Sequence, residues 1–527
     1  MNRFDRRNPA CVAIIPGTLD AWAAAPDAVR WPLPFADIVA PLADIYRRYV
    51  DAAAALDDPD ARAVVLLGRR AMPIMTLVQF ALWCDAARRN GQRFVGDPMF
   101  DYLAGAEVPT PDTLQPISEA APPGGQWARR LARTSSWTPW HRLPRAMLAP
   151  DGVALAHNSL LRTRLRDTGH AVRNAYDEEF AFTEKTDDAF FARIDADGLA
   201  AHTTAALTRD LPVDEDIRGR LAGSVHAVLV DSFEDSAHLL SRLRATPKLP
   251  TRLFSGTGGK RMSRALGLEI MRRGGTAVRH DHGGSFVLLD SPDAVALNEM
   301  SVSTSFVVAT PDAAESKGLQ VARQRATPFG DCTIEGGSGD PGFDVGSAGL
   351  ARKPSPGGRR RVMYVSTLFY GLHQVSPPVL PAPLYADWQT RLIGLLSSMP
   401  IDFTCKPHPG GLQPPANLAP ARDARTIAAR FEEAVADVDV LIYDFPATTT
   451  LAVGLCTDRS IVLVDHGTMR FSESHRDAIA ARCGIVAATY DERNRPIVDR
   501  GELEAAICDR PTIADPSYFR RLFLGAS

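Results

Sequence analysis

Short apolar runs alternate with loops of small and polar residues along the last third of the chain. The runs, each with its following loop, are RVMYVSTLFYG from residue 361, IDFTCKPHPGG from 401, DVDVLIYDFPATTTLAVG from 437 and SIVLVDHG from 460. Each run is rich in β-branched residues and predicts a buried parallel strand. Loops after parallel strands gather at the carboxyl edge of their sheet, where ligands bind. We therefore expect a nucleotide-binding domain in this part of the chain.

The first 340 residues show a related alternation with more helix. The run RAVVLLGRR from residue 62 predicts a strand, and the apolar segment after it predicts a helix that ends at Gly91. Further strands are expected at 224–235, 251–259 and 276–284, with an amphipathic helix over 260–274. Alternation of strands and helices predicts a second Rossmann-like domain, so the expected fold class is α/β.

Glycine, proline and serine are concentrated between Asp331 and Arg361, where apolar residues are few. Such a composition is typical of a linker between domains. The expected divisions are an N-terminal domain with a helical insertion over 1–340, a linker over 341–360, a second domain over 361–510 and an amphipathic helix within 511–527.

Length and composition restrict the function classes. A chain of 527 residues is too long for one ordinary core, and its formal net charge of -3 argues against a general nucleic-acid binder. The seven cysteines form no C-x-x-C pair, which suits a reducing compartment and gives no zinc pattern. Pro16, Gly17 and Asp20 interrupt the first apolar run, so we expect a buried strand there rather than a signal peptide. The expected location is the cytoplasm, at most peripheral to the inner membrane.

Hydroxyl, basic and acidic residues directly follow three of the four runs. They are Ser366 and Thr367 after the first run, Lys406, His408 and Pro409 after the second, and Asp444, Thr448, Thr449 and Thr450 after the third. Free N–H groups at a helix start, threonine hydroxyls and a nearby cation together favour a phosphate. These residues therefore predict a seat for a diphosphate or a nucleotide monophosphate. The alternatives are a rigid His-Pro turn at His408 and a solvated lysine at Lys406.

In the N-terminal half, the expected strand near 276 ends at His280-Asp281-His282-Gly283-Gly284. Paired glycines let a ligand approach the backbone, and a histidine beside them is expected to face a cleft. A purely structural histidine at a strand end is the alternative. Asp231, at the end of the strand expected over 224–235, is a second candidate for acid or base chemistry. Two Asp-x-Asp pairs, at Asp195 and Asp437, are too common by chance to predict a metal site.

The ordered set of loops in the last third resembles the donor-binding domain of bacterial surface-polysaccharide transferases with the GT-B fold. The similar families are capsule and lipopolysaccharide glycosyltransferases, both sialyltransferase-like and Kdo-transferase-like, and the teichoic-acid glycerophosphotransferases. The resemblance lies in Tyr364 to Thr367, Lys406 to Pro409 and Asp444 to Thr450, although Phe445-Pro446-Ala447 departs from the usual Asp-Tyr-Ser-Ser. His280 to Gly284 resembles the Gln-His-Gly-Gly segment of the acceptor domain, with Asp281 in place of glutamine.

The resemblance implies two parallel-sheet domains that face each other across a cleft, with the tail 511–527 crossing back to the first domain. It implies an inverting, metal-independent glycosyltransferase without a cofactor, and it modestly favours CMP-Kdo or a CMP-nonulosonate as the donor. The acceptor would be a hydroxyl of a saccharide or a lipid-linked saccharide. His282 would be the base, with Asp281 orienting it or replacing it and Asp231 and Glu234 in reserve. The alternatives are a CDP-glycerol or polyol phosphotransferase, a non-catalytic scaffold of the same fold, and a sugar-nucleotide epimerase.

Tryptophans and arginines interleave between residues 127 and 145. This pattern predicts peripheral contact with an anionic bilayer, or a hold on a lipid-linked acceptor. The alternative is a solvated helix that its tryptophans pack against the domain.

Overall fold

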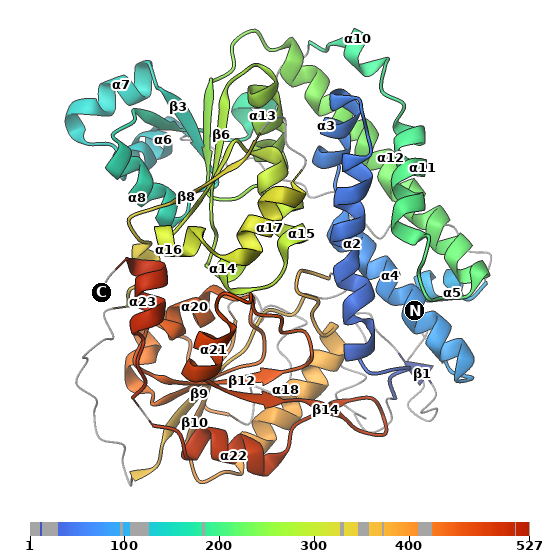
Figure 1. Cartoon of the computed structure of the whole chain (residues 1–527), viewed down its shortest axis with the longest axis vertical. Coiled ribbons are helices and arrows are strands. Elements are labelled where there is room, and N and C mark those ends of the chain that lie inside the picture. The colour runs from blue at the N-terminus through green and yellow to red at the C-terminus, as the bar shows by residue number, and fades with distance from the viewer. Residues whose placement is uncertain are drawn as a thin grey trace.

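The computed structural model describes residues 11–12, 30–94, 98–105, 126–181, 185–326, 331–345, 358–370, 374–408, 424–511 and 513–525. Two parallel sheets dominate it, one above the other in the view of Figure 1. This architecture confirms the α/β class and the two Rossmann-like domains with parallel sheets. Their arrangement is GT-B-like.

The N-terminal sheet has six parallel strands in the order β4-β3-β5-β6-β7-β8. Its strands are β3 (Gly152–Leu155), β4 (Val172–Asn174), β5 (Arg252–Ser255), β6 (Thr276–His280), β7 (Ser305–Val308) and β8 (Thr333–Gly336). The helices and 3-10 turns among these strands are α8 (Ser159–Thr168), α13 (Arg261–Arg272), α14 (Ser285–Leu288), α15 (Pro292–Asn298), η4 (Met300–Val302), α16 (Pro311–Ala314), α17 (Lys317–Arg325) and η5 (Pro341–Phe343). The strands expected near 251 and 276 and the helix between them are therefore confirmed.

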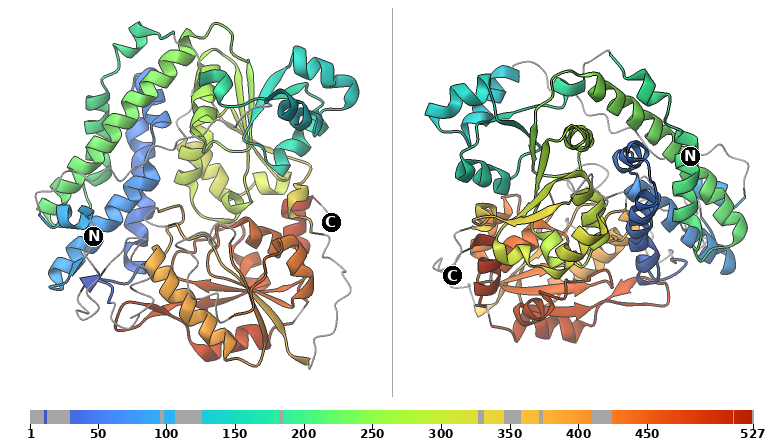
Figure 2. Two further views of the ribbon diagram at one scale, coloured as in Figure 1. Left: turned by 180° about the vertical axis from the view of Figure 1, so that it is seen from behind. Right: turned by 45° about the horizontal axis from the view of Figure 1, so that its top comes forward.

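A layer of helices stands beside this sheet and extends down to the second domain (Figures 1 and 2). Its members are α2 (Ala36–Ala54), α3 (Pro59–Leu67), α4 (Ala71–Arg89), α5 (Pro98–Leu103), α9 (Glu178–Ala181), α10 (Asp188–Phe191), α11 (Ala196–Thr208) and α12 (Glu215–Ala245). The short strands β1 (Cys11–Val12) and β2 (Arg93–Phe94) pair near its lower end. At the opposite end of the sheet lie α6 (Gln126–Ser135), η3 (Trp140–Arg142) and α7 (Leu143–Leu148).

Two strand predictions in this half are wrong. The run from residue 62 belongs to α3, which Asp58 caps by accepting a hydrogen bond from the N–H of Asp60. The segment 224–235 lies within α12, a helix of 31 residues. Its buried residues Leu221, Val225, Leu229 and Phe233 recur every four positions, which is a helical spacing.

Asp231 consequently does not stand at the end of a strand. It lies in the middle of α12 on the solvent-exposed side. The geometry that made it a candidate for acid or base chemistry is absent.

The C-terminal sheet has five parallel strands in the order β10-β9-β11-β12-β13. They are β9 (Arg361–Val365), β10 (Asp402–Lys406), β11 (Val440–Tyr443), β12 (Ser460–Asp465) and β13 (Cys483–Ala487), and a small hairpin adds β14 (Thr489–Tyr490) and β15 (Pro496–Ile497). The helices and the 3-10 turn are α18 (Ala382–Ser397), α19 (Phe431–Ala434), η9 (Val435–Asp437), α20 (Thr449–Leu455), α21 (Arg476–Arg482), α22 (Arg500–Cys508) and α23 (Ser517–Leu524). All four runs from the last third are strands, as predicted.

The two domains are joined by backbone contacts as well as by side chains. Leu289 and Phe471 form an antiparallel bridge, and the N–H of Asp290 donates to the carbonyl of Arg470 at 2.6 Å. Helix α23 lies against the N-terminal domain, where the hydroxyl of Thr310 donates to the carbonyl of Leu522. These links hold the carboxyl edges of the two sheets toward one another.

Within the described residues, no single helix is both long and apolar enough to cross a membrane. Helices α3 and α4 meet that test only as a pair bent by 68°.

Candidate functional site

The predicted donor loops lie at one edge of the C-terminal sheet. Lys406 at the end of β10 and Tyr443 at the end of β11 are both in register with Val365 of β9, the strand between them. Neighbouring strands are about 4.8 Å apart, so the loops that begin at Ser366, Pro407 and Asp444 start side by side. Pro409 lies outside the described residues.

The two basic residues of this edge differ in burial. Lys406 is buried, and its Nζ donates to the carbonyl of Pro407 at 3.2 Å. Burial lowers the pKa of Lys406. His408 is exposed at the surface of the edge, and desolvation followed by the charge of Lys406 lowers its pKa. The N–H of Ser366 donates to the carbonyl of Lys406 at 3.2 Å, so the loops after β9 and β10 start in contact.

Asp444 is buried at this edge, where it accepts hydrogen bonds from three side chains. Its carboxylate accepts hydrogen bonds from Tyr364 Oη at 2.5 Å, Trp388 Nε1 at 2.9 Å and Tyr385 Oη at 3.2 Å. Burial raises the pKa of Asp444 to about 6, against the lowering effect of the three donors. Tyr385 Oη in turn accepts from the N–H of Thr367 at 2.9 Å. Asp444 thus positions the β9 loop through Tyr385, which contacts both the carboxylate and the N–H of Thr367.

The predicted threonines begin α20. Thr448 is its N-cap, and its hydroxyl lies 2.9 Å from that of Thr450. Thr449 is exposed at the first position of the helix.

The N-terminal domain contributes the loop after β6. His280 is fully buried with Nδ1 3.1 Å from the carbonyl of Ser255, and desolvation lowers its pKa to about 3. Asp281 is also buried, and desolvation raises its pKa to about 7. Its carboxylate accepts from the N–H of His282 at 2.8 Å and of Gly284 at 3.2 Å. These two bonds fix the loop and leave the His282 side chain exposed.

The two predicted halves of the site meet at Gly283. A Cβ atom placed on Gly283 would lie 2.4 Å from Thr449 Oγ1, so the β6 loop packs directly on the start of α20. Gly283 also has φ +85°, a left-handed conformation that glycine adopts without strain. His282 therefore stands beside the junction with Thr449.

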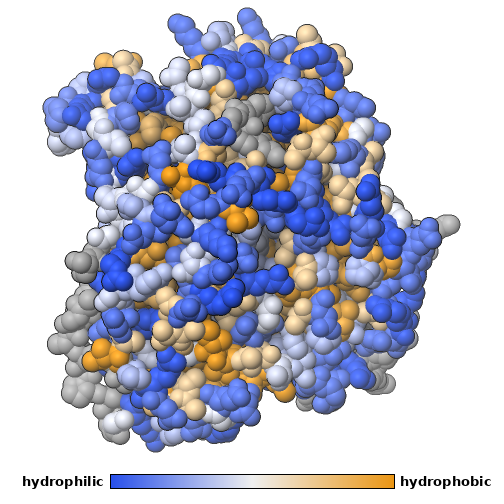
Figure 3. Space-filling view, viewed as in Figure 1, coloured by the Kyte–Doolittle hydropathy of each residue, from blue (hydrophilic) through white to orange (hydrophobic). Residues whose placement is uncertain are grey.

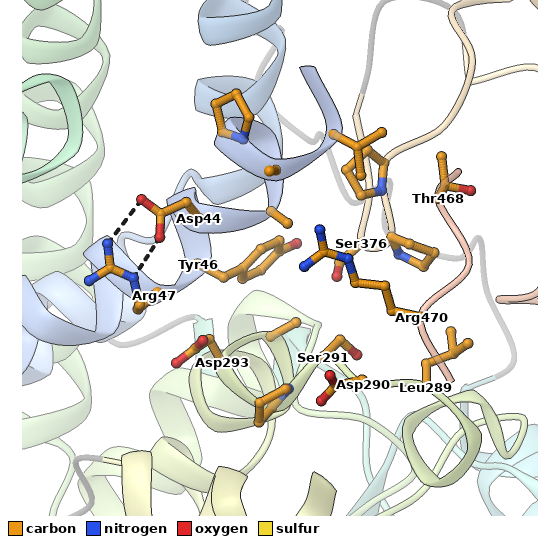
Figure 4. Close-up of a pocket in the computed structure, with 18 residues that line it drawn as sticks. Asp44, Tyr46, Arg47, Leu289, Asp290, Ser291, Asp293, Ser376, Thr468 and Arg470 are labelled. Atoms are coloured by element: carbon orange, nitrogen blue, oxygen red, sulfur yellow. Dashed lines mark hydrogen bonds and ion pairs between the residues drawn. The ribbon is translucent and has the colours of Figure 1, made fainter. Parts of the chain in front are cut away.

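A cavity of about 550 Å³ opens between the domains (Figure 4). Its walls come from α2, from the segment between α14 and α15 together with the start of α15, and from two loops of the C-terminal domain. The charged and hydroxyl-bearing residues among them are Asp44, Tyr46, Arg47, Asp290, Ser291, Asp293, Ser376, Thr468 and Arg470. We call this space the domain cavity. The predicted phosphate residues do not line it.

A second cavity, of about 20 Å³, shares Pro378 and Thr468 with the domain cavity. It lies above the ends of β9, β11 and β12, and Thr367, Asp444 and His466 are in its wall. The second cavity is therefore adjacent to the domain cavity and borders the edge that carries the predicted donor loops.

Asp290 and Arg470 are functional candidates that the sequence did not indicate. They come from opposite domains, their backbones are hydrogen-bonded, and both side chains are exposed in the domain cavity. The guanidinium of Arg470 points into that cavity (Figure 4). His466 was also missed, although Asp465-His466-Gly467 follows the fourth apolar run in the same way that the predicted loops follow theirs.

His466 is a buried histidine at the end of β12. Its ring is 3% exposed, stands edge-on to Trp388 at 4.4 Å, and has no protein hydrogen-bond partner in the described part of the chain. Desolvation lowers its pKa to about 3, below the ordinary value of about 6.5, so its contribution to stability is complete above pH 6.5 and is lost as the pH falls toward 3.

We therefore expect His466→Phe to reduce the acid sensitivity of folding. At pH 5, protonation of this histidine stabilises the unfolded chain by about 2 kcal/mol and lowers the free energy of unfolding by that amount. The variant has no such loss, because phenylalanine does not titrate. Urea unfolding at pH 7 and pH 5 measures it. An equal loss of unfolding free energy in both proteins would show that His466 is not held neutral.

No family model matches the chain, and no curated protein does. Among solved structures, a similarity was found to a complex of 3,4-dichloroaniline with a UDP-glucosyltransferase from Polygonum tinctorium that is capable of glucosylating indoxyl. The sequences are 10% identical, the match covers 67% of this chain and 79% of that one, and the TM-score is 0.29. The fold assignment depends on the two parallel sheets themselves.

Proposed function

We propose that the chain is a glycosyltransferase that moves a sugar from a nucleotide-activated donor to an acceptor hydroxyl at the junction of its two sheets. The contact of Gly283 with Thr449 is the observation that supports it most. Sugar transfer requires a seat for the leaving phosphate and a base for the acceptor within reach of each other. The loops that carry His282 and Thr448 to Thr450 meet at this contact.

In this proposal the C-terminal edge holds the donor. Lys406, His408 and the threonine hydroxyls bind the phosphate, and they stabilise the negative charge that develops on it as the sugar leaves. Ser366 and Thr367 are within the same edge, where Tyr385 and Asp444 hold the loop. Donors fixed in this way need little reorganisation during the reaction.

The N-terminal domain would activate the acceptor. His282 is the proposed base, and Asp281 fixes its backbone. The domain cavity is the proposed acceptor site, because its carboxylates, its hydroxyls and the ring of Tyr46 suit a saccharide. Asp44 pairs with Arg47 and Arg48, and Asp293 pairs with Arg325, so the lining offers no excess of positive charge that would favour a nucleotide diphosphate.

The finer proposal is a CMP-linked donor, CMP-Kdo or a CMP-nonulosonate, used in the cytoplasm to build a bacterial surface polysaccharide or its precursor. Its support is the resemblance of the ordered loops. A polyol phosphotransferase would use the same phosphate seat, so the group gained by the acceptor distinguishes the two reactions by mass.

Binding of a nucleotide is the first measurable consequence. We expect CMP, among CMP, UMP, UDP and GDP, to raise the Tm of the protein, because a ligand that binds only the folded state stabilises it. His408→Ala and Lys406→Ala should each weaken that shift, since both remove a phosphate contact. Asp231→Ala, on the exposed side of α12, is the matched control and should keep it.

The outcomes of this titration are distinct. A shift with another nucleotide that the same variants abolish would keep the transferase and replace the CMP donor. No shift with any nucleotide would favour a non-catalytic module of this fold. Interconversion of nucleotide sugars without an acceptor would indicate an epimerase.

A further inference from the structure

Residues 126–150, which form α6, η3 and α7, make a basic and aromatic arm on the N-terminal domain. The arm contains five arginines and no aspartate or glutamate, in a chain whose formal net charge is -3. It projects from the end of the sheet opposite the helical layer (Figures 1 and 2). Its charge is therefore concentrated at one corner of the molecule.

Large apolar side chains are exposed on the same arm. Trp140 is 84% exposed, Leu148 86% and Trp127 64%. In the described part of the chain the other exposed large apolar side chains are Met72, Ile485, Ile497 and Ile513, which are 36–63% exposed and are spread over both domains. In Figure 3 the corner that carries α7 shows apolar residues among strongly hydrophilic ones.

The arm does not need these exposed side chains to fold. Trp137 anchors it: the ring is 3% exposed, and its Nε1 donates to the carbonyl of Val172 on β4 at 2.9 Å. The N–H of Asn174 donates to Thr134 Oγ1 at 3.1 Å, which ties the end of α6 to the same strand. The structural explanation for tryptophan in this segment thus applies to Trp137, whereas Trp127 and Trp140 face solvent.

Four of the five arginines are exposed, whereas the side chain of Arg130 is 18% exposed and pairs with Glu179. Arg145 is 66% exposed although it pairs with Asp151, and Arg129 is exposed with no ion pair in the described residues. Arg142 donates to the carbonyl of Gly169 and is also exposed. Cationic groups beside exposed indole rings are the two features that bind an interfacial segment to anionic lipid.

We propose that this arm docks on an anionic lipid bilayer, with Trp127, Trp140 and Leu148 at the interface and the arginines among the headgroup phosphates. A nucleic acid could pair its phosphates with the arginines and stack its bases on the indole rings. It would not bury Leu148, which is 86% exposed, whereas a bilayer interface would. The inference does not require the proposed function. If both hold, the arm brings the domain cavity to a membrane that carries a lipid-linked acceptor.

Vesicle co-sedimentation tests the proposal on the full chain. Binding should be strong to vesicles of phosphatidylglycerol with phosphatidylcholine, weak to phosphatidylcholine alone, and weaker as salt increases. The double variant Trp127→Ser/Trp140→Ser should bind at least about ten-fold more weakly, because it lacks the two indole rings that enter the bilayer interface on binding. Arg129→Gln/Arg145→Gln should lose about five-fold for each arginine.

Two matched controls remove the same chemistry elsewhere. Ile513→Ser deletes an apolar side chain that is 63% exposed, and Arg500→Gln deletes an arginine whose side chain is 55% exposed, both in the C-terminal domain. Their vesicle binding should equal that of the unaltered protein, and the arm variants should keep its Tm. Equal binding by arm variants and controls would overturn the proposal. So would binding of single-stranded RNA without binding of anionic vesicles.

Discussion

Replacing His282 by alanine should lower kcat about 10²–10⁴-fold while donor binding is retained, because a positioned general base contributes that much. The side chain is exposed, and the next residue, Gly283, contacts Thr449. The bond from the His282 N–H to Asp281 belongs to the backbone and survives the substitution. Steady-state rates of product formation give kcat, and the nucleotide-induced shift in Tm reports donor binding separately.

Asp281→Asn distinguishes the two candidate bases. If His282 is the base, the asparagine variant loses rate mainly through disorder of the loop, and raising the acceptor concentration recovers part of it. If the carboxylate is the base, Asp281→Asn abolishes turnover and His282→Ala leaves it nearly unchanged. That second result would contradict the role assigned to His282 and retain the junction as the reaction site.

The sequence was most informative where the strands are buried on both faces. In the C-terminal sheet, residues such as Val440 to Tyr443 form continuous apolar runs, and each run ends at a polar loop. The register of parallel strands then places the loops together without further information. This is why the arrangement of Ser366, Lys406 and Asp444 along one edge could be predicted.

Where a helix is buried on several sides, the hydrophobic pattern of the sequence predicted a strand instead of a helix. Within α12, small residues such as Ser224, Ser232 and Ser236 are buried beside Val225 and Phe233, so polarity does not mark the solvent side. A short window then reads as a β-branched run. Helical spacing becomes visible only over a longer segment, and Asp231 was misplaced with the strand.

The walls of the domain cavity could not be predicted from local pattern. Asp290 and Arg470 lie in different domains, and the bridge of Leu289 with Phe471 brings them together. The role of Asp444 was equally hidden, because its three donors come from β9 and α18. Sequence indicated that an acidic residue ends β11, but only packing shows that protein hydroxyl and indole groups surround it.

The largest structural effect is expected from Gly283→Ala. A methyl group there would lie 2.4 Å from Thr449 Oγ1, so either the threonine side chain or the loop itself must shift. Overpacking of this kind costs about 1–3 kcal/mol, and displacement of reacting groups by about 1 Å can cost 10²-fold in rate. We expect a lower unfolding free energy by urea denaturation and about a 10²-fold loss of activity.

Gly274→Ala provides the matched control for backbone strain. Gly274 has φ +80° and nothing within 4 Å of an added Cβ, so it carries the cost of a left-handed alanine, about 1–2 kcal/mol, without the clash. Thr449→Ala should then rescue Gly283→Ala and not Gly274→Ala, because the next atom at the junction, Thr449 Cβ, lies at an ordinary 3.4 Å. A double-mutant cycle on the unfolding free energy measures this coupling. Additive effects would mean that the two loops do not touch in solution, and the transferase proposal would lose its main support.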